Sequence, residues 1–284
     1  IMVKKLGTLL GTVAVAGDAL QYSTVNVHAD KVTVGSVTSD ADIWRHIAKS
    51  PAAKKADLQI KVKEFTDGAT LNRATASGQV DVNAFQSYSY FLAFNKQTTT
   101  SKLAALWTTY IEPLGIYSDQ YKKVDEIPEG APIAIARDNA DAARGLRLLA
   151  NAGLITLKSD FSALSGVSDI ADNPHHFDFK EIDDTTGVSL LKNDKSVAAV
   201  LISNSVSQAG GLNVLKDSIY HESINTSTKD NINILATRQS QANNKTYKKL
   251  VKLYHNASEQ KWVTDKYHGT KVEVKKSLSY LEGK

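Results

Sequence analysis

Arg144 occupies a position in this sequence from which it could bind an anion. Residues 131–136 are apolar and predict a buried strand, after which Asp138 and Asn139 supply capping oxygens for a helix with Arg144 on its opening turns. Open α/β sheets bind ligands at such strand-to-helix junctions, and a guanidinium can hold a carboxylate through two parallel hydrogen bonds. The alternative is a surface arginine on a polar helix flank, which is how we interpret Arg147.

Asn233 and a group of aromatic residues offer two further binding chemistries. Asn233 lies between Ile232 and Ile234 in an apolar strand, where a buried amide needs hydrogen-bonding partners that a ligand could supply. Phe85 and Tyr90 follow the predicted end of another strand and could enclose an apolar side chain. Aromatic residues at this spacing also occur in ordinary cores, so the sequence leaves both interpretations open.

The sequence lacks the patterns that most enzymes and metal proteins carry. The absence of cysteine excludes disulfides, thiolate metal sites and thiol nucleophiles. No phosphate-binding loop, dinucleotide fingerprint or nucleophile elbow is present. His175 and His176 are adjacent in a predicted loop, a spacing that does not suit a shared metal ion. We therefore expect no enzymatic activity, no metal site and no cofactor.

Composition and charge are those of an ordinary globular protein. The 284 residues include 34 Lys or Arg and 30 Asp or Glu, a net charge of +4 that gives no reason to expect nucleic acid binding. A chain of this length forms one large or two modest lobes. The segment from Lys245 onward holds ten lysines and four acidic residues. Its periodicity predicts a helix with a solvated lysine face, or one attracted to an anionic cell-envelope polymer.

The first 29 residues read as a secretory signal peptide. Lys4 and Lys5 precede an apolar run at residues 6–17, which is shorter than the ~20 residues that a membrane span requires. Small residues permit cleavage after Ala16 or after Ala29. Asp18 stands where a bacterial lipobox would have its cysteine, so we expect an exported protein, extracellular or at the cell surface, without the usual lipid anchor.

The rest of the chain alternates apolar strands with amphipathic helices, which predicts parallel sheets with crossover helices. Residues 111–117 form an extended apolar connection that we interpret as the first crossing between two lobes, with residues 231–237 as the return. The prediction is thus an α/β chain in which one lobe comprises residues 30–113 and 236–284 and the other comprises residues 114–235.

Four motifs in fixed order carry a resemblance to a known family. They are residues 82–86 (VNAFQ), 112–118 (EPLGIYS), 135–158 and 231–238 (NINILATR). Together they resemble the NLPA lipoprotein family, the methionine-type substrate-binding proteins of ABC importers, with similar spacing from about Lys31 to Tyr267. The resemblance implies a two-lobed periplasmic-binding-protein fold of type II, with a ligand cleft between lobes that are joined by two crossing segments.

The resemblance also implies which residues bind the ligand. In that family an arginine and asparagines hold the α-carboxylate and α-amino groups of an amino acid, and aromatic residues enclose its side chain. By position, the arginine is Arg144, one asparagine is Asn233, and two aromatic members are Phe85 and Tyr90.

Four further positions of the implied site depart from the family pattern. Ser87 replaces a histidine, and Gly68 replaces a tyrosine. The second asparagine falls on Ser203, with Asn204 one place later. Because these changes affect the side-chain pocket more than the main-chain anchor, we expect an amino acid or short peptide that differs in shape from methionine.

The function implied is capture of a small amino acid or dipeptide by lobe closure and delivery to an ABC permease, by a monomeric protein. The rival hypothesis is a secreted or surface-associated adhesion protein that is retained by charge and has an altered or inactive cleft.

Overall fold

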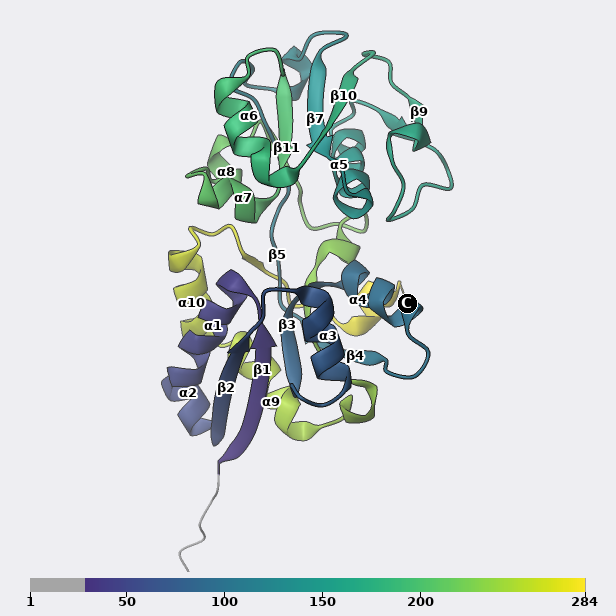
Figure 1. The fold of residues 1–284 in the computed structure, drawn as a ribbon. Helices are drawn as coiled ribbons and strands as arrows, with labels where there is room; N and C mark the ends of the chain where they lie inside the picture. The colour runs from purple at the N-terminus through teal and green to yellow at the C-terminus, as the bar shows by residue number, and fades with distance from the viewer. Residues whose placement is uncertain (1–28, 284) are drawn as a thin grey trace, which may run out of the picture.

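The computed structural model describes residues 29–283, so the predicted signal segment and the lipobox-like residues lie outside the described residues. The described chain folds into two α/β lobes, drawn one above the other in Figure 1. None of the helices in residues 29–283 has the length and apolar character needed to cross a bilayer.

Lobe 1 is built on a five-stranded sheet with the order β2-β1-β3-β13-β4. Its strands are β1 (Asp30–Ser36), β2 (Leu58–Glu64), β3 (Val82–Ser87), β4 (Leu103–Thr108) and β13 (Asn233–Arg238). β1 is parallel to β2 and β3, as predicted, but β13 is antiparallel to β3 and β4. The difference arises because β13 returns from the other lobe and enters the sheet from the opposite end.

Helices cover both faces of this sheet (Figure 1). They are α1 (Thr38–Lys49), α2 (Pro51–Lys55), α3 (Gly68–Ala76), α4 (Tyr88–Gln97), α9 (Lys245–Tyr254), α10 (Ala257–Lys266) and α11 (Leu278–Glu282).

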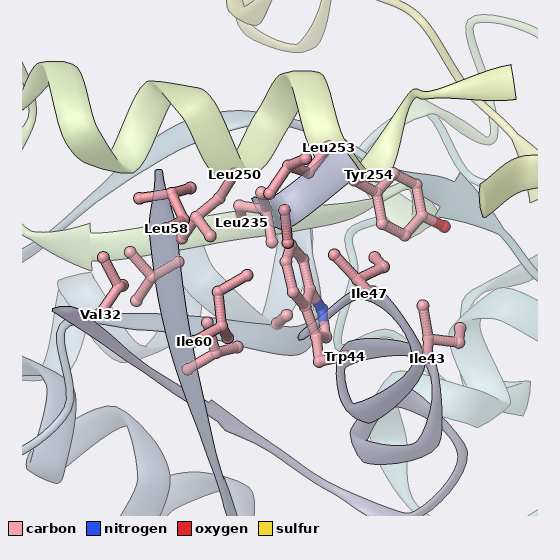
Figure 2. Packing of buried hydrophobic residues seen from close by; sticks show 14 of the residues in the cluster. Val32, Ile43, Trp44, Ile47, Leu58, Ile60, Leu235, Leu250, Leu253 and Tyr254 are labelled. Carbon is pink, nitrogen blue, oxygen red and sulfur yellow. The ribbon is translucent and has the colours of Figure 1, made fainter. Parts of the chain in front are cut away.

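The core of lobe 1 joins the first and last thirds of the chain. Figure 2 shows Trp44 and Ile47 of α1 packed beside the sheet, with Leu250 and Tyr254 of α9 on the same cluster. Trp44, Ile47 and Tyr254 are each 1% exposed. Burying such side chains stabilises a fold by roughly 1.5–3 kcal/mol each, so α9 is an integral part of lobe 1.

Lobe 2 has its own five-stranded sheet, in the order β10-β7-β11-β6-β12. Its strands are β6 (Gly115–Tyr117), β7 (Pro132–Ala136), β10 (Asp178–Ile182), β11 (Ala199–Ile202) and β12 (Tyr220–His221). Its helices are α5 (Asn139–Asn151), α6 (Gly187–Asn193), α7 (Asn204–Ala209) and α8 (Val214–Asp217), and a small hairpin pairs β8 (Thr156–Leu157) with β9 (Ile170–Asp172).

Two segments connect the lobes. The chain leaves lobe 1 through β5 (Tyr110–Ile111), which pairs with β14 (Val272–Glu273), and enters lobe 2 at β6. It returns through residues 222–232. The predicted boundary between residues 235 and 236 is too late, because β13 is already paired with β3 at Asn233.

The lysines of α9 lie at one end of lobe 1. Lys249 Nζ is 3.3 Å from a carboxylate oxygen of Asp30 and 3.2 Å from the carbonyl oxygen of Ala56. The start of β1, the end of α2 and the start of α9 therefore meet there. We call this surface the basic pole; its lysines are Lys31, Lys54, Lys55, Lys245, Lys248 and Lys249.

Candidate functional site

A cavity of about 480 Å³ lies between the two lobes. It takes its wall from β3 and α4 of lobe 1, from α5 and α7 of lobe 2, and from both connecting segments. All eight residues proposed from the sequence line it; the complete lining is Val37, Thr66, Gly68, Phe85, Gln86, Ser87, Tyr90, Glu112, Arg144, Ser203, Asn204, Ser205, Asn231 and Asn233. The structure thus brings together side chains from motifs that are far apart in the sequence.

Two aromatic rings form one end of the cavity. Phe85 and Tyr90 meet edge to face, with ring centroids 5.8 Å apart. Phe85 lies within β3, whereas we expected it after the end of that strand. A Cβ atom on Gly68 would be 2.5 Å from Phe85 Cε2 and 3.1 Å from the Tyr90 hydroxyl oxygen. The ring positions therefore depend on the missing side chain at residue 68.

Ser87 positions these rings through the backbone. It caps the N-terminus of α4, where its hydroxyl accepts a hydrogen bond from the backbone N–H of Tyr90 at 3.2 Å. Its hydroxyl oxygen is also 3.0 Å from that of Ser89. Ser87 thus orients the first turn of α4, which carries Tyr90.

A buried amide network fixes β3 behind the aromatic wall. Asn72 of α3 donates to Gln86 Oε1 at 2.9 Å, Asn83 donates to Asn72 Oδ1 at 3.0 Å, and Gln86 donates to Asn83 Oδ1 at 2.8 Å. Asn72 and Asn83 are fully buried. Buried amides hold one arrangement when their hydrogen bonds are satisfied. This network therefore fixes the part of β3 from which Phe85 and Gln86 face the cavity.

Arg144 is held by groups of the protein itself. Its Nε donates to Glu222 Oε1 at 2.9 Å, and its Nη2 donates to Glu222 Oε2 at 2.5 Å and to the Glu112 carbonyl oxygen at 2.7 Å. Burial alone would lower the pKa of Arg144, but Glu222 together with Asp141 and Glu112 outweighs this effect and raises it. The forked contact that we expected for a ligand is therefore made with Glu222, and no hydrogen bond of Nη1 occurs within residues 29–283.

Glu222 ties Arg144 to both connecting segments. Its side chain is 3% exposed and accepts hydrogen bonds from the backbone N–H of Leu114 and from Asn231 Nδ2, each at 3.0 Å. Leu114 belongs to the first crossing and Asn231 to the return. A carboxylate in this place holds the guanidinium and both connecting segments together.

A second charged cluster lies on the lobe 1 side of the cavity. Lys271 Nζ, on a side chain that is 1% exposed, is 2.6 Å from Glu112 Oε1 and 3.4 Å from Asp40 Oδ1. It also lies over the ring of Tyr110, 4.3 Å from its centroid. Burial alone would lower the pKa of Lys271, but Asp40 and Glu112 outweigh burial and raise it. The ammonium therefore stays charged and holds Glu112 at the cavity wall.

Asn204 and Ser203 differ in what they offer a ligand. Ser203 is engaged by Asp184, which accepts from its backbone N–H at 3.2 Å and from its hydroxyl at 2.5 Å. Asn204 is 3% exposed, and its Nδ2 donates to Glu112 Oε1 at 3.1 Å. Its buried Oδ1 has no hydrogen-bond partner among the described residues. A buried acceptor without a partner is costly, so Asn204 is the stronger candidate for the second asparagine.

Asn233 and Asn231 add two amides to the same cavity. Asn233 is half-buried, and no hydrogen bond to its side chain occurs within residues 29–283. Asn231 uses its Nδ2 on Glu222, as described above. Both amides are thus placed to contact a ligand in the cavity.

Sequence reasoning missed several members of this site. Glu112 and Asn231 lay inside motifs that we recognised, but nothing marked their side chains as functional. Glu222 and Lys271 gave no signal at all, because their partners Arg144 and Glu112 are 78 and 159 positions away. Within residues 29–283, no group of three or more His, Asp or Glu side chains could hold a metal ion.

A family model described as NlpA lipoprotein matches residues 32–275. The chain belongs to the NlpA lipoprotein family. This member is 32% identical over 246 residues to the methionine-binding lipoprotein MetQ of Bacillus subtilis (strain 168), an alignment that covers 86% of this chain and 87% of the relative.

Solved structures of similar proteins confirm the fold. Protein PG110 from Staphylococcus aureus matches with a TM-score of 0.75 and 34% identity, covering 89% of this chain and 97% of that chain. A nutrient binding protein from Burkholderia cenocepacia, bound to methionine, matches with a TM-score of 0.72 and 32% identity, covering 85% of this chain and 99% of that chain. This NlpA member therefore has the predicted two-lobed periplasmic-binding-protein fold.

Proposed function

We propose that this protein is an extracytoplasmic substrate-binding protein of an ABC importer, and that it captures an amino acid or short peptide between its lobes. The observation that carries the proposal is that the buried Oδ1 of Asn204 and the Nη1 of Arg144, two residues of one cavity wall, have no hydrogen-bond partner among the described residues. An acceptor and a cationic donor on one wall fit the ammonium and carboxylate groups of a zwitterion. A relative named as a methionine-binding lipoprotein and a similar structure with bound methionine support a ligand of this class.

The geometry suggests how such a ligand would lie. Its ammonium group would donate to Asn204 Oδ1 and to the carboxylate of Glu112, which Lys271 holds in place. Its carboxylate would accept from Arg144 Nη1 and from the amide of Asn233. Its side chain would then point toward the Phe85 end of the cavity.

Binding would favour a closed arrangement of the lobes. Glu112 lies on a connecting segment, the aromatic rings come from lobe 1, and Arg144 and Asn204 come from lobe 2. A ligand that contacts both lobes stabilises the closed form by its extra contacts there, and residues 222–232 and the first crossing are the hinge. We propose that an ABC permease recognises this closed form of a monomeric binding protein.

A thermal-shift screen over the amino acids and a set of dipeptides tests the function. A ligand at 100 times its dissociation constant adds about 2.7 kcal/mol to the free energy of unfolding, which gives a measurable rise in Tm. No rise with any of these compounds would contradict the proposal and favour an inactive cleft.

Replacement of Asn204 by leucine is expected to weaken zwitterion binding by roughly tenfold or more, because a hydrogen bond to a charged group contributes about 1.5–3 kcal/mol. Calorimetry with the best ligand of the screen measures the change. The ligand's analogue without the amino group is the control, and its affinity should hardly change. Equal losses for both compounds would show that Asn204 does not bind the ammonium group.

The basic pole supports a second proposal, retention at the cell surface by charge. The basic pole has six lysines and two nearby carboxylates, Asp30 and Asp57. Among the described residues Lys249 is the only one of the six lysines in an ion pair. We expect elution from cells at about 1 M salt, where the Debye length is about 3 Å. A variant with Lys245 and Lys248 changed to glutamate should elute at a lower salt concentration than a control variant with the same two substitutions at Lys122 and Lys123, which lie outside the basic pole. Identical elution of both variants would contradict the proposal.

A further inference from the structure

A second cavity, of about 450 Å³, adjoins the first one and is also lined by both lobes. The two cavities share Ser87, Tyr90, Arg144 and Asn231 in their walls. The second is formed by α4 on one side and by α5 with the loop around Leu164 on the other. A molecule that passes Tyr90 and Arg144 would therefore extend from the first cavity into the second.

Apolar side chains face this second cavity and remain exposed. Among the described residues, five large hydrophobic side chains are at least 39% exposed, and three of them line this cavity: Tyr90 at 42%, Leu92 at 44% and Leu164 at 64%. Leu92 belongs to lobe 1 and Leu164 to lobe 2. Exposed apolar groups that converge on one hollow from two lobes are typical of a binding groove.

The charged groups of the second cavity leave two cations without a carboxylate. Lys96 of α4 and Arg147 of α5 both line it, and no ion pair of either occurs within residues 29–283. The guanidinium of Arg147 lies over the ring of Phe161, 5.4 Å from its centroid. Asp141 and Asp230 also line the cavity. Arg144 is neutralised by Glu222, so the two remaining cations are matched by two carboxylates. Lys96 and Arg147 can therefore receive a carboxylate, and the exposed Leu92 and Leu164 suit an uncharged side chain.

We propose that the second cavity binds the second residue of a peptide whose first residue occupies the first cavity. This inference rests on the proposed function. The ammonium group of the peptide lies at Asn204, the backbone passes between Tyr90 and Arg144, and an apolar second side chain packs on Leu92 and Leu164. The terminal carboxylate then lies within the reach of Lys96 or Arg147. The ligand class is a dipeptide or short peptide with an apolar second residue.

Calorimetry with three ligands tests the second cavity: methionine, methionyl-glycine and methionyl-leucine. Burial of a leucine side chain on an apolar surface is expected to make methionyl-leucine bind about tenfold more tightly than methionyl-glycine. Replacement of Leu164 by serine should remove most of this difference and leave the affinities for methionine and methionyl-glycine unchanged. Leu215, which is 42% exposed and lines neither cavity, provides the matched control through the same substitution.

The outcomes separate this inference from the proposed function. Equal affinities for the two peptides would overturn the inference. Binding of methionine in the same experiment would still support the proposed function. A loss for all three ligands in L164S would also overturn it, because Leu164 would then act in lobe closure. If none of the three ligands bound, the proposed function would fail for methionyl compounds, and this inference would fail with it.

Discussion

Replacement of Lys271 by methionine is expected to lower the free energy of unfolding by about 3–5 kcal/mol, the cost of leaving buried charges without their partner. The ammonium of Lys271 is 2.6 Å from Glu112, which lines the cavity, and 3.4 Å from Asp40. Methionine keeps most of the side-chain volume, so the loss of unfolding free energy measures the contribution of the Lys271 charge. Urea unfolding followed by circular dichroism gives the value.

Lys261 provides the control for this experiment. Its side chain is 76% exposed and pairs with Asp265 on the surface of α10. An exposed pair of this kind contributes about 0–1 kcal/mol, so the methionine variant at residue 261 should unfold almost as the parent protein does. Equal stabilities of the two variants would show that the ion pairs of Lys271 do not stabilise the fold.

Replacement of Arg144 by methionine is expected to have two effects, which a second substitution separates. Among the described residues Arg144 is the only cation bonded to Glu222, whose side chain is 3% exposed, so its removal destabilises the fold by about 3–5 kcal/mol. The substitution also removes Nη1 from the cavity and should weaken binding of carboxylate ligands by roughly tenfold to 100-fold. Unfolding curves and calorimetry measure the two effects separately.

The double variant R144M with E222Q should regain much of the stability, because the neutral amide needs no cation, but it should not regain affinity. The parent protein with E222Q alone tests the positioning role of Glu222, since it retains Nη1 but loses the ionic partner that orients the guanidinium. Recovery of full affinity in the double variant would refute the assignment of Arg144 as a ligand-binding residue.

Local patterns made much of this structure predictable. The buried strand before α5, the capping residue Asp138 and the apolar face of α1 follow from spacing and capping chemistry alone, and the structure has Asp138 accepting from the backbone N–H of Asp141 at 2.9 Å. The motif resemblance correctly implied the family and fold. It also selected eight residues that all line one cavity.

The rest depended on contacts between distant residues. No local pattern shows that Glu222 accepts two hydrogen bonds from the Arg144 guanidinium, because the sequence does not distinguish a glutamate in a polar loop from a solvated residue. The antiparallel direction of β13 likewise depends on where the chain re-enters lobe 1. The choice between Ser203 and Asn204 required knowing that Asp184 already engages the serine.

The place of β13 between β3 and β4 has a consequence for the order in which the protein folds. In the described sheet β4 pairs with β13 and with no other strand, so lobe 1 stays incomplete until residues 233–238 are available. Lobe 2 is one continuous stretch of chain and needs no later segment. When the chain emerges from its N-terminus, all of lobe 2 is available before the last segments of lobe 1. We therefore expect lobe 2 to complete its folding before lobe 1, which needs β13 and α9 as its final elements.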